Sequence, residues 1–178
     1  MNKPELKQAF TETMQSYLDA LDRYSDEQFV AKPDEAEWSL GQMYQHLYEA
    51  NTYFFLANVK RCLEKRKGQE GGEMTAAGQN VHQHNSFPPI KVKRPAAPNS
   101  PEPVAQDREA YRVLYAQTLR EGLDWAEALA QDDGSYKTQH YVFGWLNATE
   151  WLQGLEIHAR HHIRQRHERE AWLGIATV

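Results

Sequence analysis

Cysteine is nearly absent from this sequence, because Cys62 is the only one among 178 residues. One thiol cannot form an intramolecular disulfide, and it cannot supply the thiolates of a cysteine-based zinc site. A bound metal would therefore rest on imidazole and carboxylate groups, and the chain has 8 histidines and 25 acidic residues. Low cysteine usage is typical of a reducing compartment, so we expect a cytoplasmic location.

Long apolar runs and an excess of positive charge are also missing. No window approaches the roughly 20 apolar residues that span a bilayer, and the N-terminus has no apolar segment of signal-peptide length. The net charge of -5 provides no overall attraction to nucleic acid or to an anionic membrane. Basic residues near the C-terminus alternate with Glu168 and Glu170, as in an ordinary solvated helix end. We therefore expect a soluble protein that binds neither nucleic acid nor membranes.

Four stretches of the chain repeat apolar residues every three or four positions, which is the spacing of an amphipathic helix. They span about residues 4–23, 39–67, 105–130 and 147–172. Two starts carry a capping box, Ser39 with Gln42 and Asn147 with Glu150, in which each side chain bonds the backbone N–H of the other residue. A chain of this length suits one domain, which we place over residues 1–178.

Between the second and third helices the helical pattern breaks down, over about residues 68–104. Six of the eight prolines lie between Pro88 and Pro103. A connection this long is either functional or disordered, although residues 74–81 favour a short helix and residues 90–92 an extended piece. No alternating pattern predicts a strand. Four long helices joined by one proline-rich crossover predict an all-α fold, a four-helix bundle.

Three histidines are candidate metal ligands. His158 and His162 lie four residues apart on the last helix, so their imidazoles project from one side and can reach a single ion at about 2.0–2.1 Å. The pair alone fits a solvated helix face equally well. His46 follows the capped start of the second helix, and a bundle brings facing helices close enough for a third ligand. Three imidazoles leave an open coordination position, which is the catalytic rather than the closed structural pattern.

Two further side chains are candidates for a supporting role at this centre. Glu49 lies one turn after His46 and is a candidate for proton transfer, although an ordinary interface position also fits it. Gln165 shares the helical stripe of His158 and His162 and is a candidate to orient a ligand or a bound water.

The other five histidines have no clear place in the centre. His161 points about 100° away from its neighbour on the helix, which indicates a surface position or contact with a ligand. His140 fits either a satisfied buried side chain or an active-site residue. The remaining three, which we expect to be solvated, are His82, His84 and His167.

Two motifs in sequence order resemble the DinB-like superfamily, and the resemblance covers nearly the whole chain. The first motif is WSLGQ over residues 38–42, followed by His46. The second is GWL over residues 144–146, followed by His158, the pair His161-His162 and Gln165. The resemblance implies a four-helix fold and a divalent metal, often zinc or nickel, on the residues that match here as His46, His158 and His162.

The resemblance also implies a metal-dependent enzyme. Some members transfer a low-molecular-weight thiol, such as bacillithiol or mycothiol, to small electrophiles, and many are classed as hydrolases. By this analogy the ion lowers the pKa of a bound thiol or water. We expect thiol transfer to a small-molecule substrate, with a metal-dependent hydrolase or a non-enzymatic, metal-stabilised interaction protein as alternatives. Aromatic residues make up 11% of the chain, which favours a homodimer.

Overall fold

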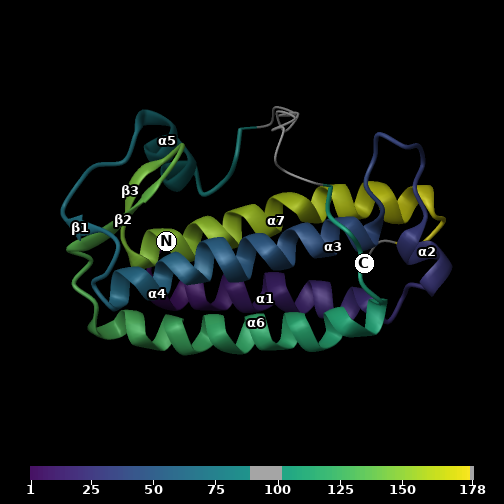
Figure 1. The fold of residues 1–178 in the computed structure, drawn as a ribbon, viewed down its shortest axis with the longest axis horizontal. Coiled ribbons are helices and arrows are strands. Elements are labelled where there is room, and N and C mark those ends of the chain that lie inside the picture. Colours follow the sequence, from purple (N-terminus) through teal and green to yellow (C-terminus); the bar gives the residue numbers. More distant parts are fainter. Residues whose placement is uncertain (89–101, 177–178) are drawn as a thin grey trace.

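The computed structural model describes residues 1–88 and 102–176, and long helices define its longest axis (Figure 1). Lying side by side, they form the predicted four-helix bundle, which is confirmed. Its helices are α1 (Lys3–Leu21), α3 (Leu40–Glu49) continued by α4 (Ala57–Leu63), α6 (Arg108–Ala128) and α7 (Ala148–Trp172). Within the described ranges no helix has both the length and the apolar character that crossing a membrane requires.

The two predicted capping boxes are present and set where α3 and α7 begin. Ser39 Oγ accepts from the Gln42 backbone N–H at 3.1 Å, and Gln42 Oε1 accepts from the Ser39 N–H at 3.1 Å. Asn147 and Glu150 form the same reciprocal pair at the start of α7. Because each box orients the first turn of its helix, it also determines which later residues face the neighbouring helices.

The second long helix contains a π-helical segment that its sequence pattern does not predict. This segment, η1 (Ala50–Leu56), lies between α3 and α4 and begins one turn after His46. A π turn holds more residues than an α turn, so it shifts every later side chain around the helix. After the shift Asn51 and Phe55 are buried, whereas Tyr53 is exposed.

A small antiparallel sheet covers one end of the bundle and corrects the expectation that the chain has no strand (Figure 1). The strands are β1 (Gln69–Glu70), β2 (Tyr136–His140) and β3 (Gly144–Leu146), in the order β1-β2-β3. Gln69 lies opposite Lys137, and Gln139 lies opposite Trp145. Strands of two to five residues are too short to show a periodic pattern in the sequence.

Three shorter helices lie outside the four-helix bundle. α5 (Ala76–His84) packs against α7 and corresponds to the short helix predicted over residues 74–81. The 3-10 turn η2 (Leu129–Gln131) ends α6, and α2 (Asp26–Val30) connects α1 to α3. Much of the predicted crossover, including the extended piece at 90–92, lies outside the described residues.

Buried tyrosines join the four helices through hydrogen bonds. Tyr17 of α1 donates to the Ala159 carbonyl of α7 at 2.7 Å, and Tyr44 of α3 donates to the Tyr17 carbonyl at 2.8 Å. Tyr115 of α6 donates to the Tyr44 carbonyl at 3.0 Å. All three rings are at most 1% exposed. Each hydroxyl therefore keeps a partner when its ring is buried, which avoids the penalty of an unpaired polar group.

His140 at the end of β2 is a satisfied buried side chain, which resolves the two alternatives that the sequence left open. Its Nδ1 accepts the backbone N–H groups of Val142 at 3.0 Å and Phe143 at 3.1 Å. A ring nitrogen that accepts must be unprotonated, and burial, followed by the charge of His82, lowers the pKa of His140 to about 4. The neutral imidazole therefore holds the tight turn between β2 and β3.

Acidification is expected to destabilise the protein through His140. In the unfolded chain His140 takes up a proton near pH 6.5, whereas in the folded protein it does so only near its lowered pKa. The contribution of neutral His140 to the free energy of unfolding is therefore complete above pH 6.5 and is lost as the pH falls towards 4. We expect a loss of roughly 1–2 kcal/mol, allowing for solvent screening. His140→Asn keeps an acceptor without a titrating group, so urea unfolding between pH 7.5 and 4.5 should show a smaller pH dependence. His84→Asn is the exposed control, and equal pH dependence in all three proteins would contradict the assignment.

Candidate metal centre

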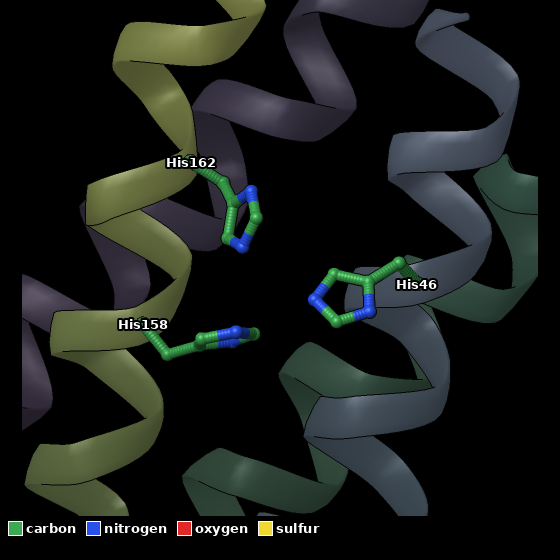
Figure 2. A group of neighbouring side chains, drawn as sticks. All are labelled: His46, His158 and His162. Atoms are coloured by element: carbon green, nitrogen blue, oxygen red, sulfur yellow. The ribbon is translucent and has the colours of Figure 1, made fainter. Parts of the chain in front are cut away.

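The structure brings the three predicted histidines together between two helices. His46 comes from α3, and His158 and His162 come from successive turns of α7 (Figure 2). Each offers a ring nitrogen, and these atoms lie within 4.8 Å of one another. The ring centroids are 5.3 Å apart for His46 and His158, 5.1 Å for His46 and His162, and 4.8 Å for His158 and His162. Figure 2 shows the three rings turned towards a common point.

Burial keeps two of these imidazoles neutral. The pKa of His158 lies well below its ordinary value, first because of burial and then because of the neighbouring His162 and His46. Burial, followed by the charge of His46, lowers the pKa of His162 to about 3. A neutral imidazole keeps a free lone pair, and this is the form of histidine that binds metals. His158 and His162 can therefore bind a cation at neutral pH without first releasing protons.

Hydrogen bonding determines which nitrogen of His162 is available. Its Nδ1 lies 2.8 Å from Oε1 of Gln165, and this amide oxygen can only accept, so Nδ1 carries the hydrogen and Nε2 keeps the lone pair. The predicted candidate Gln165 is thus beside the centre and orients one ring. In metalloproteins the second nitrogen of a ligating histidine is usually held in this way.

His158 provides a further indication that the site suits a cation. Its Nδ1 is buried and has no hydrogen-bond partner among the residues that the structure describes. An unpaired buried polar atom costs about 1–3 kcal/mol, and a bound ion or an ordered ligand in the cluster can offset this cost. Three imidazole nitrogens are also suitable donors for a divalent ion such as zinc or nickel. The residues present therefore fit the metal that the resemblance implies.

Aromatic rings surround the histidines. The Trp38 ring centroid lies 5.1 Å from that of His46, and the Phe55 centroid lies 5.4 Å from that of His158. Phe87, which follows α5, lies 6.4 Å from His158. Sequence reasoning did not assign Phe55 or Phe87 to the site, because the first lies within the π segment and the second follows a short helix far away in the chain. These rings make the surroundings of the cluster apolar.

Glu49, the other candidate, is directed elsewhere. Its carboxylate is exposed and accepts a hydrogen bond from Nε2 of Gln45 at 2.8 Å. Gln45 Oε1 in turn accepts from Tyr111 of α6 at 2.8 Å. In the described part of the chain, no acidic residue or cysteine joins the three histidines in a group that could hold a metal. The structure thus places Gln165 beside the centre and Glu49 on the side that faces α6.

The remaining histidines lie outside the group. His161 is partly buried, and its ring centroid is 5.2 Å from that of Phe87. His82 was expected to be solvated but is partly buried, with Nδ1 3.2 Å from Oε1 of Gln153. His84 is exposed, as predicted, and its Nδ1 bonds the Asn80 carbonyl one turn earlier.

Together, the fold and the site define a four-helix-bundle protein with a three-histidine centre between two of its helices. The family model of the DinB superfamily matches residues 9–165. Because this match spans most of the chain, the protein belongs to the DinB superfamily. No curated protein matches the chain.

Two solved structures have a similar fold. One is YfiT from Bacillus subtilis, described as "a probable metal-dependent hydrolase with an unusual four-helix bundle topology". It aligns with a TM-score of 0.66 at 15% identity, over 98% of this chain and 89% of its own. The other is a DinB-like protein from Bacillus cereus, with a TM-score of 0.61 at 16% identity over 97% and 93% of the two chains. At these identities the similarity establishes the fold.

Proposed function

We propose that this protein is a metal-dependent enzyme that transfers a low-molecular-weight thiol to an electrophilic small molecule. The observation that carries the proposal is the cluster of three imidazoles, which no further metal-ligating side chain of the described residues joins. A divalent ion held by His46, His158 and His162 would retain a position for an outside ligand and would lower the pKa of a thiol or water bound there.

The surrounding residues prepare the site for such a ligand. Gln165 holds His162 in the tautomer that leaves Nε2 free. The rings of Trp38 and Phe55 limit the access of water to His46 and His158. An apolar wall of this kind suits a soft sulfur ligand, which needs few hydrogen-bond partners.

Among the described residues no carboxylate joins the three histidines, which favours a thiol over water as the nucleophile. Glu49, the acidic candidate, bonds Gln45 rather than facing the histidines. A thiol has an ordinary pKa of about 8.5, whereas that of bulk water is about 15.7, so a thiol needs less help from a protein base. In the transfer the thiol proton passes to solvent, the sulfur bonds to the electrophilic carbon, and that carbon releases its leaving group.

Hydrolysis is the second candidate, and the similarity to YfiT favours it. It uses the same histidines, with water in place of the thiol. A non-enzymatic role, in which a metal ties α3 to α7 and the surface binds another protein, is the third. The three alternatives differ in what they require: a thiol, water alone, or only the metal.

A parallel assay separates these alternatives. Protein loaded with zinc or nickel is incubated with bacillithiol or mycothiol and 1-chloro-2,4-dinitrobenzene, and separately with 4-nitrophenyl acetate without a thiol. Thiol-dependent product that His158→Ala loses and His84→Ala keeps would support transfer. Metal-dependent ester cleavage without thiol would instead support hydrolysis. If a chelator lowers the melting temperature strongly but neither reaction occurs, the enzymatic proposal is wrong.

A further inference from the structure

A pocket of about 220 Å³ lies on the outer side of α7, next to the metal centre. The segment over residues 86–88, which follows α5, forms one wall, and α7 forms the other with Arg160, His161 and Arg164. A water molecule occupies about 30 Å³ of liquid, so the pocket is large enough for a small polar group with several heavy atoms. The function proposed above does not use this pocket.

Phe87 connects the pocket with the metal centre. Its ring lines the pocket and lies 5.2 Å from the ring of His161 and 6.4 Å from that of His158. His161 is in turn 5.6 Å from His162. Two residues of the pocket lining, Phe87 and His161, therefore lie beside the candidate ligands His158 and His162.

Two cationic side chains line the pocket, and one of them is held in place. Arg160 bonds the carboxylate of the buried Glu156 through Nε at 2.7 Å and Nη2 at 3.1 Å, and Nη2 also bonds the Asn85 carbonyl at 2.6 Å. Its Nη1 makes no hydrogen bond or ion pair with the described residues. The guanidinium is thus fixed from one side and keeps donors for an outside acceptor.

The second cation, Arg164, is only weakly engaged. Its Nε lies 3.3 Å from Glu168, and both side chains are more than half exposed, at 60% and 55%. Such a surface pair contributes little and is screened by salt. None of the described residues that line the pocket is acidic. An incoming anion would therefore meet two guanidinium groups and an imidazole without a competing carboxylate in the lining.

We infer that this pocket binds the carboxylate or phosphate of a small organic molecule whose reactive atom reaches the histidine centre. The planar guanidinium group of Arg164 matches the two oxygens of such an anion, Arg160 can add a hydrogen bond from its Nη1, and His161 adds a third polar group. The presence of an anion site follows from the pocket itself, whereas its assignment to a substrate or thiol rests on the proposed function.

The anion site can be tested without any metal. Metal-free, ¹⁵N-labelled protein is titrated with inorganic phosphate and, separately, with succinate. We expect saturable NMR shifts concentrated in residues 86–88 and 157–164. Arg164→Gln should weaken binding at least about tenfold, and Arg164→Lys should give an intermediate loss because it keeps the charge without the planar fork. Arg120→Gln, an exposed change on α6 across the bundle, should leave binding unchanged (Figure 1). Shifts that do not saturate, or that Arg164→Gln leaves unaltered, would overturn the inference.

A second measurement separates this inference from the proposed function. In the metal-loaded enzyme, Arg164→Gln should raise KM for a carboxylate-bearing reactant and leave its uncharged analogue unaffected. The comparison is made once with a thiol that carries the carboxylate and once with an electrophile that carries it. The reactant whose KM rises in Arg164→Gln is the one that the pocket holds. Anion binding without turnover would support the anion site and contradict the proposed enzymatic function. Turnover without anion binding would support the enzymatic function and contradict the anion site.

Discussion

His158→Ala is expected to reduce affinity for zinc and nickel by more than about 100-fold, since even loss of a residue that only orients a ligand costs 10- to 100-fold. His158 is central to the cluster because its ring lies close to both His46 and His162, and burial keeps it neutral. Two remaining imidazoles from different helices hold an ion far more weakly than three. Competition with a chromophoric chelator measures the affinity directly.

Thermal unfolding provides an independent readout of the same change. A metal at 100 times its dissociation constant stabilises a folded protein by about 2.7 kcal/mol, so metal should raise the melting temperature of the wild type and leave His158→Ala almost unaffected. Gln165→Leu, which removes only the orienting acceptor of His162, should lose about tenfold in affinity. His84→Ala is the matched control on an exposed histidine. Wild-type affinity in His158→Ala would mean that the three histidines do not form the site.

Glu170→Gln is expected to reduce the free energy of unfolding by about 3–5 kcal/mol. Glu170 is 0% exposed near the end of α7, where it pairs with Arg166, itself 3% exposed, and with Arg23 at 2.7 Å. Tyr24 also donates a hydrogen bond to it. Neutralising the carboxylate leaves the Arg166 charge buried without a counter-ion. Urea unfolding at pH 7 measures the loss.

Two further variants separate an unpaired charge from a general loss of packing. Glu168→Gln changes an exposed pair on the same helix and should shift stability by less than about 0.5 kcal/mol. Replacing the buried pair together, with Arg166→Met and Glu170→Leu, should give a protein more stable than Glu170→Gln alone, because the buried Arg166 charge is then removed together with its partner. A double variant as unstable as the single one would show that this end of the bundle depends on the polar contacts themselves.

Features that depend on neighbours in sequence could be predicted well. The capped starts at Ser39 and Asn147 involve groups three residues apart, so the sequence shows both partners at once. The shared face of His158 and His162 also follows from helix geometry alone. β1 was missed because its partner strand is distant in the sequence, as with Gln69 and Lys137, and all three strands were missed because each is too short to show a pattern.

At the metal centre too, positions set by neighbours in sequence could be predicted, and positions set by other helices could not. Gln165 could be placed beside His162 because both lie on one helix, whereas the direction of Glu49 depends on Gln45, which is itself hydrogen-bonded to Tyr111 of another helix. The aromatic surroundings depend on the π segment and on the segment after α5. A π turn rotates the later side chains without a clear change in the apolar spacing, so the position of Phe55 could not be predicted.

By itself the sequence determined four helices, the capped starts of two of them, and a histidine pair on one face of the last helix, since these depend on contacts within one or two helical turns. Only the tertiary structure decided that His46 meets this pair, that His140 is a buried acceptor, and that Phe87 and Arg164 border one pocket beside the centre. The physical reason is that the helices can pack in several registers and rotations. Burial of their apolar faces selects one of these, and that selection places distant polar side chains together.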